Sequence, residues 1–263
     1  MSDATPTPLP RRWPWLIAWF RWYTRGFVRK HFHAVRLSRS GGRPTLPDLP
    51  IIIVMNHPSW WDPMVAIQLL SLFPNRQNYA VIESAQLQRY RMFGRMGFFG
   101  IDPNTMQGAF TLLRTAQVIL EQPTNMLWIT AQGQFRDVRE RPLALQQGIG
   151  LLAHRIEHGI ILPLAIEYSF WTERDPEALL RFGEPLDMAD HPEWNIRKWT
   201  EQIEAHLTQA QDILSAETMT RDPAVFETLL VGRAGVGGIY DRWRRFRAWL
   251  AGESFDREHG GKS

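Results

Sequence analysis

Cysteine is absent from the 263-residue chain. Its absence excludes disulfide bonds, a thiol nucleophile, and zinc or iron–sulfur sites built on thiolates. Long hydrophobic runs are scarce near the N-terminus, where the longest uninterrupted apolar stretch covers residues 15–20. A membrane-spanning helix needs about 20 such residues. We also expect no secretory signal peptide, because no apolar segment of the usual length leads to a small-residue cleavage site.

Hydrophobic residues make up 44% of the chain, which is enough to bury the core of one large domain. Apolar runs of strand length alternate with amphipathic segments of helical period. This alternation predicts an α/β fold, a single layered domain with a mostly central β-sheet flanked by helices and preceded by an N-terminal amphipathic basic helix. We expect strands at residues 34–41, 51–55, 78–84, 98–102, 125–130, 160–171 and 178–188. We expect helices from Pro58 to residue 73 and at residues 107–121, 144–159, 195–216 and 239–250.

Positive charge is concentrated in the N-terminal arm. Seven Lys and Arg residues and one Asp fall in residues 1–36, so this arm carries +6 and the rest of the chain −3. Tryptophans recur there at helical spacing among the arginines. This pattern predicts an interfacial helix on a membrane with anionic lipids. A helix packed on its own domain with a basic outer face is the alternative, and we expect no nucleic-acid partner because the remainder is acidic.

The stretch IIIVMNHPSWWDPMV, residues 51–65, places ionisable groups directly after a buried strand. His57 could act as a general base if a carboxylate fixed its tautomer, and Asp62 could be that carboxylate. On one continuous helix the two side chains would point to different faces, so the chain must turn between them. Pro58 and Ser59 suit such a turn. By spacing alone, a turn that merely caps a helix explains the pair equally well.

Further motifs follow in a recognisable order. NHPSWWD at 56–62 is a His-x4-Asp signature, and GFFGID at 97–102, LWITAQGQFRD at 127–137 and IILPLAIEYSF at 160–170 come after it. Over residues 35–190 the chain resembles the lysophospholipid and glycerolipid acyltransferases of the lysophosphatidate-acyltransferase type. The first motif is the specific one, and the others are weak when taken alone.

The resemblance implies transfer of a fatty acyl group from an acyl thioester to a lipid hydroxyl. His57 would take the proton of the acceptor, and Asp62 would orient His57. No covalent acyl-enzyme and no cofactor would be needed, with acyl-CoA or acyl carrier protein as the co-substrate. We predict no metal site, since His154 and His158 have ligand spacing but the sequence suggests no acidic third ligand, and surface histidines explain the pair better. The oxyanion stabiliser, the acyl chain length and the oligomeric state are not indicated.

Two motifs depart from the family pattern. Pro103 stands where the second motif usually has Arg, Gln132 replaces the Glu of the third, and Phe135 falls where its Arg would be. Those arginines are associated in the family with an acceptor phosphate, for which Arg is well suited. Either Arg136, Arg139 or Arg141 substitutes, or the acceptor is not a glycerol phosphate. We favour a neutral acceptor, such as a glycosylated isoprenoid or carotenoid lipid.

The candidate substrate-binding residues flank the two motifs: Asn56, Ser59, Trp60, Trp61, Gln132, Gly133, Arg136, Arg139 and Arg141. At least one of the two tryptophans could instead be core, and the charged residues could form an ordinary solvated loop. We divide the chain into a leader and membrane-associating helix (1–36), an acyltransferase core (37–192) and a C-terminal helical extension (193–263). We expect a peripheral enzyme on the cytoplasmic face of a membrane. A catalytically silent membrane-binding or scaffold relative is the alternative.

Overall fold

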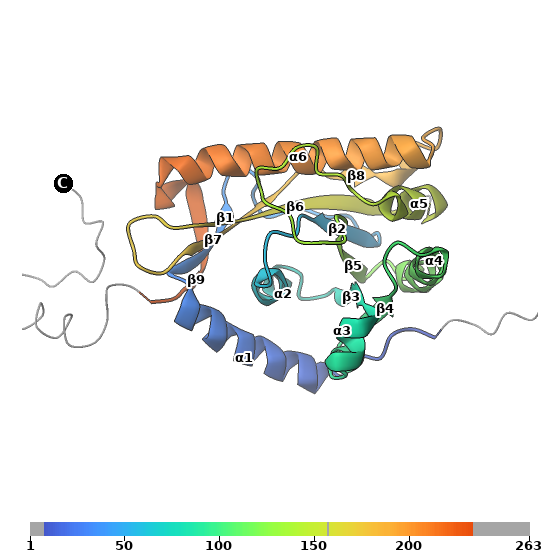
Figure 1. Cartoon of the computed structure of the whole chain (residues 1–263), viewed down its shortest axis with the longest axis horizontal. Helices are drawn as coiled ribbons and strands as arrows, with labels where there is room; N and C mark the ends of the chain where they lie inside the picture. The colour runs from blue at the N-terminus through green and yellow to red at the C-terminus, as the bar shows by residue number, and fades with distance from the viewer. Residues whose placement is uncertain (1–7, 157, 234–263) are drawn as a thin grey trace, which may run out of the picture.

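A computed structural model describes residues 8–156 and 158–233, in which nine strands form one sheet between helices (Figure 1). The strands are β1 (Ala34–Ser38), β2 (Ile51–Met55), β3 (Gln77–Glu83), β4 (Phe98–Ile101), β5 (Asn125–Thr130), β6 (Ile160–Ser169), β7 (Glu177–Phe182), β8 (Leu186–Asp187) and β9 (Phe226–Val231). The α-helices are α1 (Pro14–His31), α2 (Asp62–Ala66), α3 (Ser84–Arg89), α4 (Met106–Leu120), α5 (Gln147–Ile156) and α6 (Ile196–Thr220). The predicted α/β fold is confirmed.

Strand β2 lies near the middle of the sheet and is buried along its whole length. It pairs in parallel with β5 on one side and β6 on the other. The side chains of Ile52 and Val54 join the core under α4, α5 and α6, whereas those of Ile51 and Ile53 join the core over α1 and α2. A strand buried on both faces is apolar at every position, which explains the unbroken IIIVM run.

The strand order is β4-β3-β5-β2-β6-β7-β1-β9, with β8 pairing on β6. Strands β4, β3, β5, β2 and β6 are mutually parallel, so their carboxyl ends meet at one edge. β7 then runs antiparallel to β6. Ligands of open α/β sheets bind outside the carboxyl ends of the parallel strands. The edge to search for a site is therefore the one where residues 56, 131 and 170 follow β2, β5 and β6.

The described part of the predicted C-terminal extension belongs to this sheet and its core. α6 buries Trp199, Ile203 and Leu207 in the same core as β2, which confirms the predicted amphipathic helix. β9 pairs antiparallel with β1 and was not predicted, so this region is not helical throughout. The helix predicted at 239–250 lies outside the described residues.

The helix that follows β2 begins later than predicted. Residues 56–61 form an irregular loop, and α2 begins at Asp62 with Pro63 in its first turn. Pro58 therefore lies in the loop and not in a helix, and the second half of the predicted segment is a 3-10 helix at Ile67–Leu72. The loop is needed because a helix starting at Pro58 would carry Asp62 away from His57.

The N-terminal basic helix, α1, lies along the opposite side of the molecule from α6 (Figure 1). It buries a stripe of residues spaced four apart: Leu16, Phe20, Thr24 and Val28. Its other face exposes Trp15, Trp19, Trp22 and Tyr23. Within the described residues, no helix combines the length and the apolar character needed to cross a bilayer.

Candidate active site

The loop after β2 brings His57 and Asp62 together. The Nδ1 atom of His57 lies 2.6 Å from Oδ2 of Asp62. The Asp62 side chain is fully buried, whereas that of His57 is 19% exposed. Because a carboxylate only accepts, this contact places the proton on Nδ1 and leaves the Nε2 lone pair free to accept a proton. The predicted turn between the two residues therefore exists and holds the imidazole against the carboxylate.

Three donors surround the Asp62 carboxylate. Besides His57, the main-chain N–H of Ser59 donates to Oδ2 at 3.1 Å, and the hydroxyl of Tyr168 donates to Oδ1 at 2.7 Å. Burial raises the pKa of Asp62 above its ordinary value, although these hydrogen bonds act in the opposite direction. Burial beside Asp62 also raises the pKa of Tyr168 well above its ordinary value, so the phenol stays protonated and keeps donating.

Tyr168 was missed by the sequence predictions, although a signal for it exists. It lies on β6, where alternate residues face the same side of the sheet. Leu164 and Ile166 pack in the core next to α2, and Tyr168 is next in that series. A hydroxyl at the end of an otherwise apolar series, on the side of the sheet where Asp62 lies, is the pattern that could have identified it.

The main chain of His57 is fixed by residues distant in the sequence. Its N–H donates to Oε1 of Gln132 at 2.9 Å, and its carbonyl accepts from the N–H of Arg136 at 3.0 Å. The buried Gln132 amide also donates to the Leu143 carbonyl at 3.2 Å. An ionised Glu, as in the family pattern, could not make that second bond. Gln132 thus links the main chain of His57 to that of Leu143 and holds it in place.

Asn56 holds the end of β2 against β6. Its buried side chain donates to the carbonyl of Ile166 at 2.9 Å and accepts from the N–H of the same residue at 2.8 Å. The amide thereby continues the strand pairing by one residue while the main chain turns away. Both groups of the side chain are used, so Asn56 stabilises the site by holding the loop.

The two tryptophans of the loop differ in environment. Trp61 packs under α1, with its ring centroid 4.9 Å from that of Phe32 and 5.3 Å from that of Phe27. Trp60 is exposed and meets Trp61 edge-on. Ser59 closes the turn, because its Oγ accepts from the N–H of Trp61 at 3.2 Å. One tryptophan therefore belongs to the core, and the other is free to contact a ligand or a membrane.

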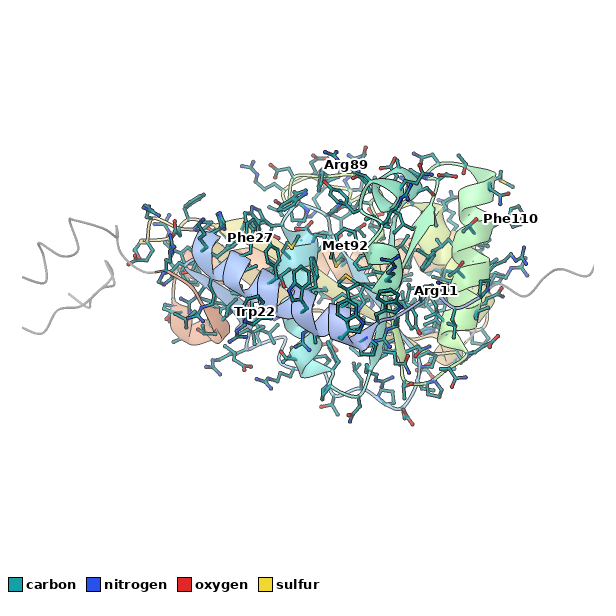
Figure 2. All side chains as sticks on the ribbon, turned by 90° about the horizontal axis from the view of Figure 1, so that it is seen from below. Arg11, Trp22, Phe27, Arg89, Met92 and Phe110 are labelled. Carbon is teal, nitrogen blue, oxygen red and sulfur yellow. The ribbon has the colours of Figure 1, made fainter. Side chains whose placement is uncertain are left out.

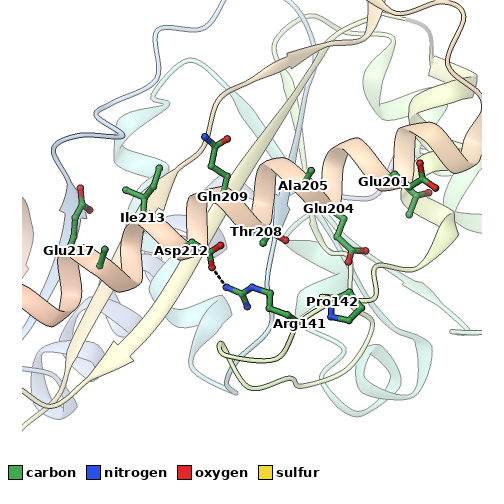
Figure 3. A pocket seen from close by; sticks show the side chains of 12 residues that line it. Arg141, Pro142, Glu201, Glu204, Ala205, Thr208, Gln209, Asp212, Ile213 and Glu217 are labelled. Carbon is green, nitrogen blue, oxygen red and sulfur yellow. Dashed lines mark hydrogen bonds and ion pairs between the residues drawn. The ribbon is translucent and has the colours of Figure 1, made fainter.

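The arginines of the third motif pair with carboxylates. Arg136 contacts Glu140 at 2.8 Å, and Arg139 contacts Asp137 at 2.7 Å. Arg141 reaches Asp212 on α6 beside a surface groove lined mainly by that helix (Figure 3). These ion pairs do not involve Asp62 or the His57 side chain, although the main-chain N–H of Arg136 donates to the His57 carbonyl. Their predicted role in binding the acceptor stays a prediction.

Gly133 and Phe135 precede Arg136 in the loop that follows β5. Gly133 has φ = +68°, the left-handed region that glycine adopts readily, and it begins the turn after β5. The Phe135 ring lies against His57, with the two centroids 4.4 Å apart. Phe135 occupies the position at which the family has Arg, and the structure places its ring in contact with His57.

A comparison with protein-family models identifies the family of this chain. The model described as Acyltransferase matches residues 35–167, which cover β1 to β6 and both residues of the His57–Asp62 pair. The chain belongs to the acyltransferase family. The predicted lysophosphatidate-acyltransferase type is therefore confirmed. No curated protein matches the chain.

The two histidines that have metal-ligand spacing, His154 and His158, lie on α5 and just after it. Within the described residues, no three or more His, Asp or Glu side chains are grouped to hold a metal ion. Nδ1 of His154 donates to the Trp194 carbonyl at 3.1 Å, and Nδ1 of His158 donates to the Ile156 carbonyl at 2.7 Å.

Changing Tyr168 to Phe should test whether the Tyr168 hydroxyl keeps Asp62 ionised and so affects the pH dependence of acyl transfer. Loss of the hydroxyl removes a hydrogen bond that lowers the pKa of Asp62, so that pKa rises further. Because Asp62 must be ionised to orient His57, the acidic limb of the kcat/KM profile should move to higher pH. We expect kcat to fall about tenfold.

The measurement is a pH–rate profile of acyl transfer, with Tyr90→Phe as the control. Tyr90 is exposed at the end of α3, where loss of a hydroxyl should change nothing. An unshifted acidic limb in Tyr168→Phe would show that the Tyr168 hydrogen bond does not act on the base.

Proposed function

We propose that this protein is a membrane-associated O-acyltransferase that moves a fatty acyl group from an acyl thioester to a lipid hydroxyl. The observation that supports it is the 2.6 Å contact of His57 with the buried Asp62 at the carboxyl edge of the sheet. The hydroxyl oxygen attacks the thioester carbonyl carbon as His57 Nε2 takes its proton. The C–S bond then breaks, and the proton passes to the departing thiolate.

Acyl-CoA or acyl carrier protein is the proposed donor. Direct transfer needs no protein nucleophile, which suits a chain without cysteine. The imidazolium formed during attack lies next to the Asp62 carboxylate, and burial of that carboxylate strengthens their attraction. This arrangement lowers the energy of the charged transition state more than that of the neutral ground state.

The test is thiol release from oleoyl-CoA, followed with and without a mixture of lipid acceptors. We expect release that depends on an acceptor and a matching acylated lipid in the extract. A protein that binds lipid vesicles but releases no thiol with any acceptor would instead be a catalytically silent relative. Comparing lipid extracts of cells with and without active protein would identify the acceptor class by the acylated species that disappears.

Membrane association is supported by the composition of the exposed face of α1. Trp22 is 72% exposed on this helix, which lies across the face seen from below (Figure 2). Arg21, Arg25 and Arg29 lie on the same helix. Exposed indoles between arginines suit the headgroup region of an anionic bilayer. Since Trp61 packs on α1, docking of that helix would bring the His57 loop to the lipid, and we place the enzyme on the cytoplasmic face.

Replacing Trp15, Trp19 and Trp22 with alanine should weaken binding to anionic vesicles about 10- to 100-fold, because three indoles no longer insert. The side chains are exposed, so the melting temperature should hardly change. Vesicle flotation provides the measurement. Met219→Ala is the control, because Met219 is equally exposed but lies on α6, on the other side of the molecule. Equal flotation of the triple variant and the control would contradict the proposal.

A further inference from the structure

An exposed aromatic ring lies against His57, outside the hydrophobic core. The Phe135 side chain is 58% exposed, although its ring lies 4.4 Å from that of His57 and is tilted by 40°. Its ring belongs to none of the buried hydrophobic clusters of the described residues. An exposed phenyl group next to a reactive side chain offers an apolar surface that a bound ligand can cover, and covering it is favourable. Its position next to the proton-accepting imidazole indicates which ligand that would be.

The position of this ring is held from both sides. Gln132 accepts from the N–H of His57, and Arg136 donates its own N–H to the His57 carbonyl. Phe135 is thus carried on a segment whose ends are attached to the base itself. Loop contacts of this kind fix the ring relative to His57, so it can act as a preorganised binding surface.

The positive charges of the same loop are compensated. Arg136 is paired with Glu140 and also meets the side-chain carbonyl of Gln134, and Arg139 is paired with Asp137. The Arg139 partner holds the pKa of Asp137 well below its ordinary range, so this carboxylate stays ionised. The guanidinium groups nearest in sequence to Phe135 therefore already have anionic partners.

An aromatic face discriminates between headgroups. It carries negative partial charge, which repels an anion placed over it, whereas C–H groups pack against it favourably. A phosphate would also lose water at an apolar surface, and the guanidinium groups of Arg136 and Arg139 already have carboxylate partners. An uncharged headgroup with a flat C–H face, such as a sugar ring, meets none of these costs.

We propose that Phe135 is the residue that selects the acceptor: its ring binds an uncharged, hydroxyl-bearing headgroup beside His57 and disfavours a phosphomonoester. This inference rests on the proposed acyl transfer, and it assigns the specificity of that site to one side chain. The ring places the acceptor hydroxyl against His57 Nε2, and the imidazole takes the proton from it. Phe135 is accordingly a substrate-binding residue and takes no part in the proton transfer.

The test compares kcat/KM for three short acceptors below their micelle concentrations, with octanoyl-CoA as the donor. Octyl β-glucoside and 1-octanoylglycerol are uncharged, and 1-octanoyl-lysophosphatidate carries the phosphate. We expect the wild type to prefer an uncharged acceptor by at least about tenfold. Phe135→Ala should lose most of that preference, chiefly through KM, and Phe135→Arg should shift it toward lysophosphatidate.

Phe110→Ala serves as the matched control, because Phe110 is 55% exposed on α4 and should leave the preference unchanged. A wild type that prefers lysophosphatidate would overturn the inference, as would Phe135 variants with an unchanged ratio. If no acceptor supports thiol release, the proposed function fails by itself. Binding of the same three compounds, followed by ligand-observed NMR, then decides the role of Phe135, and equal binding by wild type and Phe135→Ala would reject it.

Discussion

Replacing His57 with alanine should lower kcat for acyl transfer by about 10²- to 10⁴-fold, the contribution of a positioned general base. The variant should still fold. The hydrogen bonds from Gln132 and Arg136 involve only the His57 main chain, and Asp62 keeps its bonds to Ser59 and Tyr168. The loss should therefore appear in the rate and hardly in the circular dichroism or the melting temperature.

Acceptor-dependent thiol release measures this prediction, with His206→Ala as the control. His206 lies on α6, where its ring contacts the Glu184 carbonyl at 3.2 Å, far from the edge that carries the base. Its removal should leave the rate unchanged. Full activity in His57→Ala would exclude His57 as the base and with it the proposed mechanism.

Changing Asp62 to Asn should lower kcat by about 10³- to 10⁴-fold although the volume is preserved. The carboxylate accepts from His57 Nδ1–H, Ser59 N–H and the Tyr168 hydroxyl. An amide offers one accepting oxygen, and its NH₂ group favours the His57 tautomer that is protonated on Nε2. That tautomer cannot accept the proton of the acceptor hydroxyl.

The melting temperature of the Asp62→Asn variant, compared with that of the wild type, should rise with pH, although the variant is less active. Burial raises the folded-state pKa of Asp62. The folded protein therefore binds a proton more tightly than the unfolded chain, and wild-type stability falls as pH rises from the unfolded to the folded pKa. Asparagine does not titrate. Melting temperatures across this range should therefore shift in favour of the variant as pH rises, and an activity loss that follows unfolding would contradict the tautomer explanation.

The sequence predicts those strands and helices whose apolar residues follow a single clear pattern. The IIIVM run of β2 and the apolar stripe of α6 predict their elements because burial requires those residues at those positions. β9 pairs with β1 at the end of the sheet, and its FETLLV sequence lacks the unbroken apolar run that identifies β2. The start of α2 was misplaced because Pro58 and Pro63 are both suitable for a first helical turn.

The candidate site was predictable where it follows from one short stretch. His57 and Asp62 lie in a single motif, so their pairing could be proposed before the structure was known. Tyr168 reaches the pair from β6 and Phe135 from the loop after β5, and no local spacing connects them to it. Their roles arise from strand order, which places β6 and the loop after β5 on either side of β2.

The supports of His57 also determine when the site can form during folding. Gln132 lies 75 residues after His57, and Ile166 lies 110 residues after Asn56. A chain still emerging from the ribosome therefore holds the histidine motif early but has nothing to position it until β5 and then β6 are made. Contacts this distant in sequence form late and slowly. A nascent or truncated chain that ends before β6 would carry the motif without a positioned base, so catalytic competence arises only once the sheet has closed around β2.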